Sequence, residues 1–150
     1  IQKPVSLCYK KLSMSKKNSS VNLKNGFKDL KDLSSIFLNF KKKLDNLNKK
    51  SYTVAVSGGP DSLALVALSK AYSNLKKTKF SYVLVDHNIR KNSSKEAKQV
   101  KNLLKKHQIN LIIILNKKKI TSNIQSLARN TRYEILSHYC KVNKISTLLT

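Results

Sequence analysis

From residue 51 onward, short apolar runs alternate with longer amphipathic segments, and this alternation constrains the fold more than any other feature of the chain. The runs contain no regular alternation of polar residues, as is typical of strands buried on both faces. The segments between them are long enough to connect one parallel strand to the next. The runs are residues 51–56, 80–85, 111–115 and 145–149. The sequence therefore predicts a doubly wound α/β fold, with helices on both faces of a parallel sheet and right-handed crossovers.

Three helices are predicted between these strands. The first covers residues 61–75, the second opens at Ser93, and the third covers residues 122–143. Ser93 and Glu96 have the spacing of a capping box, in which the serine caps the helix and the glutamate reaches back to it. In the third helix we expect the apolar side chains to face the sheet, namely Ile124, Leu127, Ala128, Ile135, Leu136 and Tyr139.

The first fifty residues follow a different pattern. Residues 1–26 are rich in serine, asparagine and lysine without periodicity, and we expect a flexible basic tail. Residues 27–50 are predicted to form an amphipathic helix, because apolar residues recur there at spacings of three and four. The chain begins with Ile1 and its only methionine is Met14, so we expect neither end to be a natural terminus. On that expectation, residues 51–150 form one incomplete domain.

The charge balance is strongly positive, with 31 lysines and arginines against 7 acids and a formal net charge of +24. Such a field attracts polyanions, above all nucleic acid. Only three of the cations are arginines, which phosphate recognition often favours, and an excess of lysine, asparagine and isoleucine is also what an AT-rich genome encodes. The charge therefore permits an RNA partner without predicting one by itself.

The sequence supports neither a membrane span nor a metal site built from cysteine or histidine. No apolar run approaches the roughly 20 residues needed to cross a bilayer. Cys8 and Cys140 lie far apart and form no C-x-x-C pair, which indicates free thiols in a reducing compartment. Glu134 and His138 lie one helical turn apart with no third ligand nearby, so we expect both on the surface. These observations favour a cytoplasmic protein without a membrane span.

The segment between the first strand and its helix is the strongest candidate for a binding site. It reads Ser57-Gly58-Gly59-Pro60-Asp61-Ser62. The two glycines let the backbone approach a ligand closely, and Pro60 fits the opening of a helix. The helix start offers free N–H groups and the positive end of its dipole to an anion. Ser57 and Ser62 add hydroxyl donors, and Asp61 can hold a divalent cation that bridges phosphate oxygens.

This turn is neither a Walker loop nor a dinucleotide-binding G-x-G-x-x-G. It resembles the S-G-G-x-D-S signature of the PP-loop ATP pyrophosphatases, which cleave ATP between the α and β phosphates and transfer AMP to a carbonyl oxygen. Resemblance to that superfamily implies that the four strands are ordered 3-2-1-4. The signature alone indicates the superfamily and leaves the substrate open.

Three further stretches narrow the resemblance, which covers about residues 51–150. Residues 85–90 (Val-Asp-His-Asn-Ile-Arg) resemble the V-D-H-G-L-R stretch of the tRNA(Ile)-lysidine synthetases, with Asn88 in the place of glycine. Asparagine tolerates a left-handed φ better than other non-glycine residues, so this difference is compatible with the motif. Residues 123–133 resemble the N-I-Q-x-x-A-R-x-x-R-Y helix of the same family. Residues 145–150 resemble the strand that leads into its A-H-H-x-x-D-Q motif, which the chain lacks.

The same stretches contain further candidate site residues. Asp86 and His87 end the second strand, at the edge of a parallel sheet where ligands bind, and we predict that they lie near the nucleotide. Arg129 and Arg132 lie on one helical face, and two arginines together in so lysine-rich a chain indicate contacts with ATP phosphate or the tRNA backbone. Three tyrosines are expected to pack in or near the core, namely Tyr82, Tyr133 and Tyr139.

The resemblance implies ATP-dependent ligation of L-lysine to C2 of the wobble cytidine of tRNA(Ile), through an adenylated intermediate. It implies ATP and Mg²⁺ as cofactors, with the metal on Asp61, and it makes Asp61, Arg129 and Arg132 the catalytic residues. It leaves open whether the complete protein forms a homodimer. Because the chain ends together with the fourth predicted strand, we expect these 150 residues alone to bind ATP weakly and to show no turnover.

Three alternatives remain at this point. A PP-loop tRNA thiolase typically has lysine in place of Pro60 and uses paired cysteines, and the chain has neither. A non-catalytic, basic RNA-binding module of the same fold would not need Asp61. A synthetase that acts on a small metabolite is disfavoured by the positive charge and by the pair formed by Arg129 and Arg132.

Overall fold

The computed structural model of the chain describes residues 23–89, 91–116 and 124–150, with side chains described from Leu33 onward. Within that part, helices and strands alternate after a first long helix. The elements are α1 (Leu23–Leu47), β1 (Ser51–Val56), α2 (Pro60–Leu75), β2 (Lys79–Asp86), α3 (Ser93–Lys106), β3 (Leu111–Leu115), α4 (Ile124–Val142) and β4 (Leu148–Leu149). α1 belongs to one compact unit, and the other elements belong to a second.

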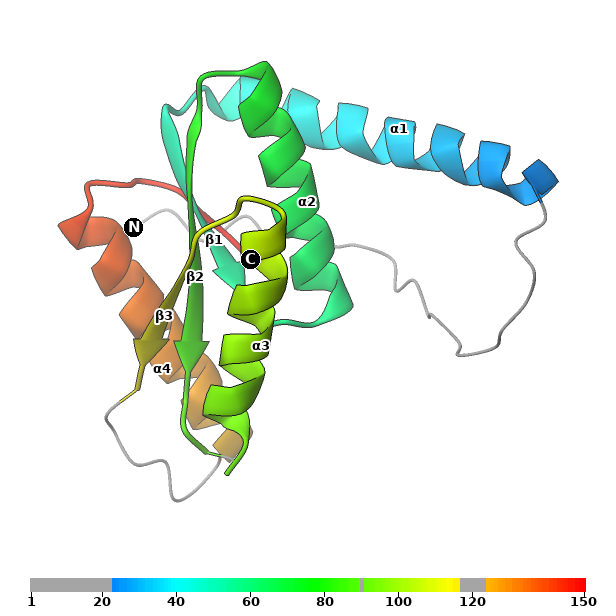
Figure 1. Cartoon of the computed structure of the whole chain (residues 1–150). Helices are drawn as coiled ribbons and strands as arrows, with labels where there is room; N and C mark the ends of the chain where they lie inside the picture. The colour runs from blue at the N-terminus through cyan, green and yellow to red at the C-terminus, as the bar shows by residue number, and fades with distance from the viewer. Residues whose placement is uncertain (1–22, 90, 117–123) are drawn as a thin grey trace. The chain divides into compact units, whose positions relative to one another are not determined.

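The four strands form one parallel sheet in the order β3-β2-β1-β4, as predicted (Figure 1). β1 pairs with β2 in a register that sets Val54 opposite Tyr82, and β2 pairs with β3 in a register that sets Tyr82 opposite Leu111. The short β4 pairs with the other side of β1. β1 is therefore an internal strand, and the order of strands reverses beside it.

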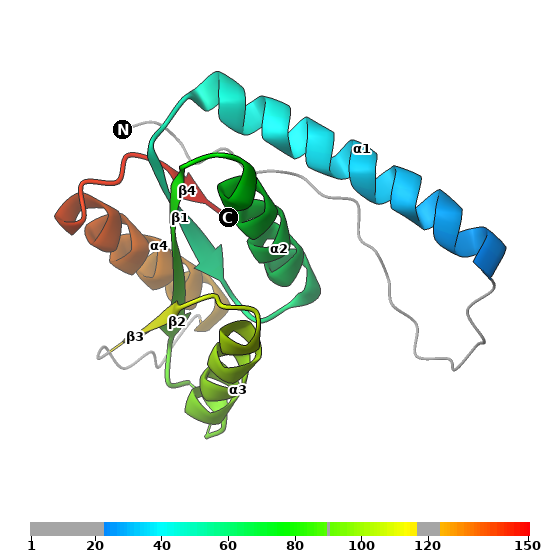
Figure 2. The same cartoon turned by 45° about the horizontal axis from the view of Figure 1, so that its top comes forward.

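Helices cover both faces of the sheet, with α2 and α3 on one side and α4 on the other (Figure 2). On the side of α2, the ring of Phe80 lies between its neighbours on the sheet, 5.3 Å from the ring of Tyr52 and 6.4 Å from that of Tyr82. The ring of Tyr72 in α2 meets it edge-on. These contacts place the aromatic residues of β1 and β2 under α2, where burial of large rings contributes strongly to stability.

On the side of α4, small and branched residues of the strands pack against that helix. Leu136, which is 1% exposed, is the centre of this cluster. Its buried partners in the sheet are Ala55, Val83 and Val85, with Ile112, Ile114, Ile135, Tyr139 and Leu148 packed around them. The doubly wound α/β fold and its strand order are thus confirmed by the arrangement of both layers.

Several boundaries differ from those predicted. α1 begins at Leu23 rather than near residue 27, because a helix once nucleated extends by one backbone hydrogen bond per added residue. Residues 1–22 of the predicted tail lie outside the described residues. β4 is limited to Leu148–Leu149, although the apolar run began at Ile145, because its ladder to β1 joins only two residue pairs.

The predicted capping box at the start of α3 is wrong. The residue in the capping position is Asn92, which makes no side-chain capping hydrogen bond, and Ser93 is already the first helical residue. The backbone N–H of Glu96 donates to the carbonyl of Asn92 instead, at 2.9 Å. The hydroxyl of Ser94 bonds to a side chain of β2, so tertiary contacts rather than local capping organise this helix start.

Two of the side chains expected to pack inward from α4 do not. Ile124 is 48% exposed and Leu127 is 41% exposed. Leu127 precedes the buried Leu136 by nine residues, which places it on the opposite side of the helix. The inward face is completed instead by Thr131 and Cys140.

The structure also bears on the predictions for the cysteines, for two surface residues and for membrane-spanning helices. Cys140 is a buried free thiol, whereas Cys8 lies outside the described residues. Glu134 and His138 are exposed, as predicted. Of the helices in the described ranges, none combines the length and the apolar character needed to cross a membrane.

Candidate active site

The turn that joins β1 to α2 has the geometry of a ligand-binding loop. Gly58 adopts a φ of 83°, a left-handed conformation that side chains other than glycine rarely adopt. Gly59 occupies the capping position of α2 without a side-chain capping hydrogen bond, and Pro60 opens the helix. The N–H groups of the first turn therefore receive no side-chain oxygen from the capping residue, which suits an anion at this end of α2.

Gly58 also packs so closely against α3 that there is no room for a side chain. A Cβ at this position would lie 2.8 Å from Cγ2 of Val100, which is closer than carbon atoms tolerate. At Gly59 the nearest atom to such a Cβ is 3.6 Å away, an ordinary contact. Val100 was not identified as a site residue from the sequence. In the fold, the turn packs against Val100.

Within the turn, the two serines bond to one another. The hydroxyl of Ser57 donates to Oγ of Ser62 at 3.1 Å, and the hydroxyl of Ser62 donates to the carbonyl of Gly59 at 2.9 Å. The backbone N–H of Ser57 also donates to Oγ of Ser62, at 3.2 Å. The predicted donation from these hydroxyls to phosphate stays a prediction, and it requires that they exchange internal partners for the ligand.

Asp86, at the end of β2, organises the connection to α3. Its carboxylate is nearly inaccessible, with 4% of the residue exposed. One oxygen accepts from the backbone N–H of Asn88 at 2.9 Å, and the other accepts from the hydroxyl of Ser94 at 2.6 Å. Asn88 has a φ of 51°, which is the left-handed conformation expected for it. Asp86 thereby fixes the shape of the loop that borders the site.

The pKa of Asp86 is lowered from its usual value by these bonds. Burial by itself raises the pKa, but the hydrogen bonds from Ser94 and Asn88, together with the charge of His87, outweigh burial. The carboxylate therefore stays ionised, and its negative charge is neutralised locally by donors. Ser94 was missed in the sequence, because no local pattern links it to Asp86.

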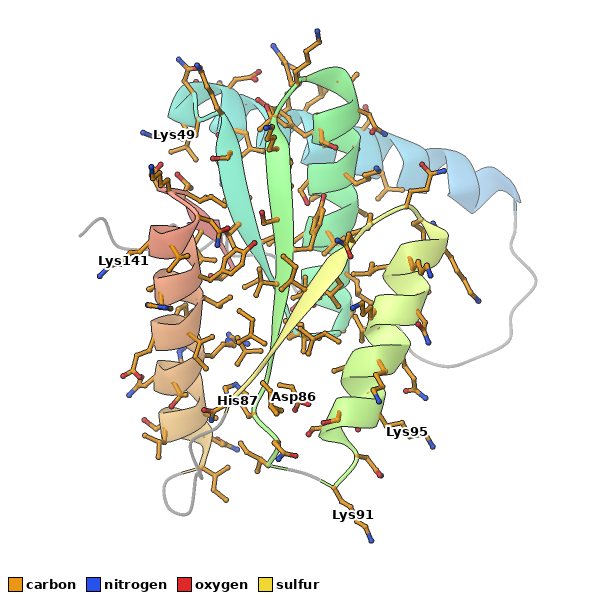
Figure 3. The ribbon with its side chains drawn as sticks, turned by 60° about the vertical axis from the view of Figure 1, so that its left-hand side comes forward. Lys49, Asp86, His87, Lys91, Lys95 and Lys141 are labelled. Carbon is orange, nitrogen blue, oxygen red and sulfur yellow. The ribbon has the colours of Figure 1, made fainter. Side chains whose placement is uncertain are left out.

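His87 lies on the other side of the same strand end, toward α4, whereas Asp86 lies toward α3 (Figure 3). Burial lowers the pKa of His87, and the positive charge of Arg132 lowers it further, although Asp86 opposes this. Within the described part of the chain, neither Nδ1 of His87 nor Nε of Arg132 has a hydrogen-bond partner, and both are buried. The imidazole is thus held neutral next to a guanidinium with a free donor.

Two pockets meet at these residues. The smaller, of about 280 Å³, connects the end of β1 and the loop of Asp86 with α3, and it brings Ser57, Asp86, His87 and Arg132 together. The larger, of about 950 Å³, is open and lies at the start of α4, where His87, Arg129 and Arg132 line it. The predicted site residues from three separate stretches therefore converge on the carboxyl edge of the sheet.

The ring of Tyr133 contacts the guanidinium groups of both arginines of α4. The guanidinium of Arg129 lies 5.4 Å from the centre of its ring, and that of Arg132 lies 5.6 Å from it. Burial raises the pKa of Tyr133, but the hydrogen bond with Thr150 and the two arginines lower it overall. The predicted packing role of this tyrosine is therefore accompanied by an electrostatic one.

Asp61 stands in the first turn of α2 and is exposed, where a carboxylate suits the positive end of the helix. Among the residues that the structure describes, no group of three or more His, Cys, Asp or Glu side chains could form a protein metal cage. Mg²⁺ usually binds through one or two carboxylates together with water and substrate phosphate. A single aspartate beside a turn that is predicted to bind phosphate fits that kind of site.

Comparison with known proteins agrees with this geometry. The PP-loop domain matches residues 33–150, and the chain therefore belongs to the PP-loop family, whose domain uses ATP. Several curated proteins that it matches are named tRNA(Ile)-lysidine synthase. The protein from Orientia tsutsugamushi is 37% identical over 98 residues, which are 65% of this chain and 22% of the relative.

Two further relatives carry the same name. The protein from Wolbachia pipientis wMel is 39% identical over an alignment of 99 residues, which covers 64% of this chain and 23% of that protein. The protein from Rickettsia akari is 33% identical over an alignment of 111 residues, which covers 71% of this chain and 25% of that protein. The chain thus spans about a quarter of the length of the curated relatives it matches. The resemblance drawn from the motifs is confirmed by these similarities.

Proposed function

We propose that this chain supplies the ATP-binding part of an enzyme that ligates L-lysine to C2 of the wobble cytidine of tRNA(Ile). The observation that carries the proposal is the turn of residues 57–62. It joins the internal strand β1 to an uncapped helix start, with Gly58 at positive φ and pressed against Val100. The shared name of the relatives supports the choice of substrate.

The site must convert the C2 oxygen of cytosine, which is a poor leaving group, into a good one. The C2 oxygen of cytosine attacks the α-phosphorus of ATP, and pyrophosphate leaves. The ε-amine of lysine then attacks C2 and loses a proton, and AMP leaves with the former carbonyl oxygen. In this scheme the first turn of α2 binds the phosphates that become pyrophosphate. Mg²⁺, held by Asp61 and the phosphates, would neutralise charge that develops as the bond breaks.

Arg132 of α4 lines the same small pocket as Ser57 of the turn. Nε of Arg132 is a buried donor without a described partner, next to His87, and Arg129 lines the open pocket beside it. We propose that they contact an anion, either ATP phosphate or the tRNA backbone, and stabilise the charge of the transition state. We propose that Asp86 affects the nucleotide indirectly, because its buried carboxylate already accepts hydrogen bonds from Asn88 and Ser94.

Nucleotide binding is tested by titrating ATP into the chain with and without Mg²⁺. Asp61→Asn is expected to weaken the Mg²⁺-dependent part of the affinity about tenfold or more, since metal sites lose 10- to 100-fold when a supporting group is removed. Asp45→Asn is the matched control, because Asp45 forms an ion pair with Lys41 in α1. Equal affinities of the Asp61 and Asp45 variants would contradict a metal role for Asp61.

Ligation is tested in the native protein with tRNA(Ile), ATP and labelled lysine. Incorporation of the lysine label with release of AMP and pyrophosphate is the expected result. Incorporation of sulfur from a sulfur donor would instead identify a PP-loop thiolase. Tight RNA binding that survives Asp61→Asn, without any incorporation, would identify a non-catalytic RNA-binding module. The cytoplasmic setting and a homodimer of the complete protein stay predictions.

A further inference from the structure

α3 presents an exposed basic face on the side away from the sheet. Five lysines form this α3 basic face, namely Lys95, Lys98, Lys101, Lys105 and Lys106, and all are exposed. At 100° per residue, their side chains fall within one sector of about 140°. The other side of the helix buries Ala97 and Leu104. The division between the two sides makes α3 strongly amphipathic, with charge as its outer surface.

These charges lack compensation within the described structure. The acid in the first turn of α3 is Glu96, and it lines the small pocket with Ala97 and Val100. None of the five lysines forms an ion pair with a described residue, whereas Lys41 in α1 is paired with Asp45 at 2.7 Å. Like charges three or four residues apart repel one another along a helix. A face of this kind is relieved when an anionic partner covers it.

The α3 basic face begins at the same edge of the sheet as the candidate active site. Ser94, next to Lys95, donates to the carboxylate of Asp86 at the end of β2, so the basic face begins at the carboxyl edge of the sheet. Lys91 and Lys95 point outward at the end of the molecule where Asp86 and His87 also lie (Figure 3). From Lys95 to Lys106 the face extends about 16 Å along the helix, since each residue adds about 1.5 Å.

We infer that the α3 basic face binds the sugar–phosphate backbone of the RNA substrate and guides it toward the pocket at the start of α3. The inference rests on the proposed function, because it assigns the docking surface for the tRNA. Lysine suits this role, since it contacts phosphates as a mobile point charge without reading bases. Base recognition is then left to the site at the carboxyl edge.

A matched pair of triple variants separates this surface from the bulk charge of the chain. Lys98, Lys101 and Lys105 are replaced together by glutamine. The control replaces Lys76, Lys77 and Lys79, which are also exposed but lie around the beginning of β2, at the opposite edge of the sheet. Both variants remove three positive charges. Binding of a tRNA(Ile) transcript is measured for both over a range of salt concentrations, together with far-ultraviolet circular dichroism as a check of folding.

The α3 variant is expected to bind the transcript about tenfold or more weakly, and its slope of log affinity against log salt is expected to fall by about one unit per lysine. The control is expected to change affinity less than about twofold at the same salt, because its lysines lie away from the path of the RNA. ATP affinity is expected to be unchanged in both variants.

Equal losses in the two variants would overturn the inference and leave the proposed function intact, because net charge alone would then explain binding. The α3 variant also fails to support the inference if it loses affinity for vesicles of anionic lipid while its affinity for tRNA is retained. If the parent chain binds no transcript even at low salt, this inference falls together with the RNA partner of the proposed function.

Discussion

Gly58 shows how one residue can set the geometry of a site. It combines a φ of 83° with a distance of 2.8 Å from its missing Cβ to Val100. Gly58→Ala is therefore expected to lower the free energy of unfolding by about 1–3 kcal/mol, through left-handed strain and overpacking. It is also expected to weaken ATP binding. Urea unfolding and ATP titration measure the two effects.

The neighbouring glycine provides the control. Gly59 has a φ of −75°, and its added Cβ would make an ordinary contact with Ser57 at 3.6 Å. Gly59→Ala is expected to be tolerated, with a change below about 1 kcal/mol in stability. In the background of Val100→Ala, the steric part of the cost at Gly58 is expected to disappear while the strain part remains. Identical costs for the two glycines would contradict the structure of the turn.

Tyr133 is a second residue with an effect on the site beyond its own contacts. Tyr133→Phe removes the hydroxyl that bonds to Thr150 and keeps the ring, whereas Tyr133→Leu also removes the surface on which Arg129 and Arg132 lie. The leucine variant is expected to be less stable than the phenylalanine variant by about 1–2 kcal/mol, from two cation–π contacts. Chemical denaturation of both variants measures the difference, and equal stability would show that the contacts contribute nothing.

At the scale of elements, α4 depends on Leu136. This side chain is 1% exposed and packs on Ala55, Val83 and Val85 of the sheet. Leu136→Ala is expected to cost about 2–5 kcal/mol, because it removes buried methyl groups and leaves a cavity. Val142→Ala, at a position that is 66% exposed near the end of the same helix, is expected to change the stability by less than about 0.5 kcal/mol. Calorimetry of the two variants tests whether α4 packs as described.

The pH dependence of stability is a property of the whole molecule. The pKa of His87 is lowered below its usual value of 6.5 in the folded chain. Below about pH 6.5 the unfolded chain therefore binds this proton more readily than the folded chain, and stability falls as the pH decreases toward the folded pKa. Above that window His87 is neutral in both states and has no effect. The loss of stability between about pH 7 and pH 5 is expected to be smaller in His87→Gln than in the parent.

The exposed His138 of α4 is the matched control for this measurement. His138→Gln is expected to retain the part of the pH dependence that His87 causes. Urea midpoints of the three proteins, taken at each pH, give the comparison. If the parent and His87→Gln lose the same stability on acidification, His87 is not held neutral by its surroundings.

The elements of this chain could be predicted because their signals are local. The run of residues 51–56 became β1 with the same ends, and residues 111–115 became β3 with the same ends. Chain order and the right-handed crossover then limit how these elements assemble. The convergence of Ser57, Asp86 and His87 was predictable for the same reason, since the carboxyl ends of parallel strands share one edge of a sheet. Such inferences use only the position of residues along elements.

The sequence by itself therefore determined the doubly wound fold and the glycine-containing turn between β1 and α2, because periodicity and glycine placement act within a few residues. Only the tertiary structure decided that Val100 supports Gly58, that Ser94 donates a hydrogen bond to Asp86, and that Leu127 faces outward. These outcomes depend on contacts between segments far apart in the chain. The energy of such a contact exists only after both segments are positioned, so no local pattern contains it.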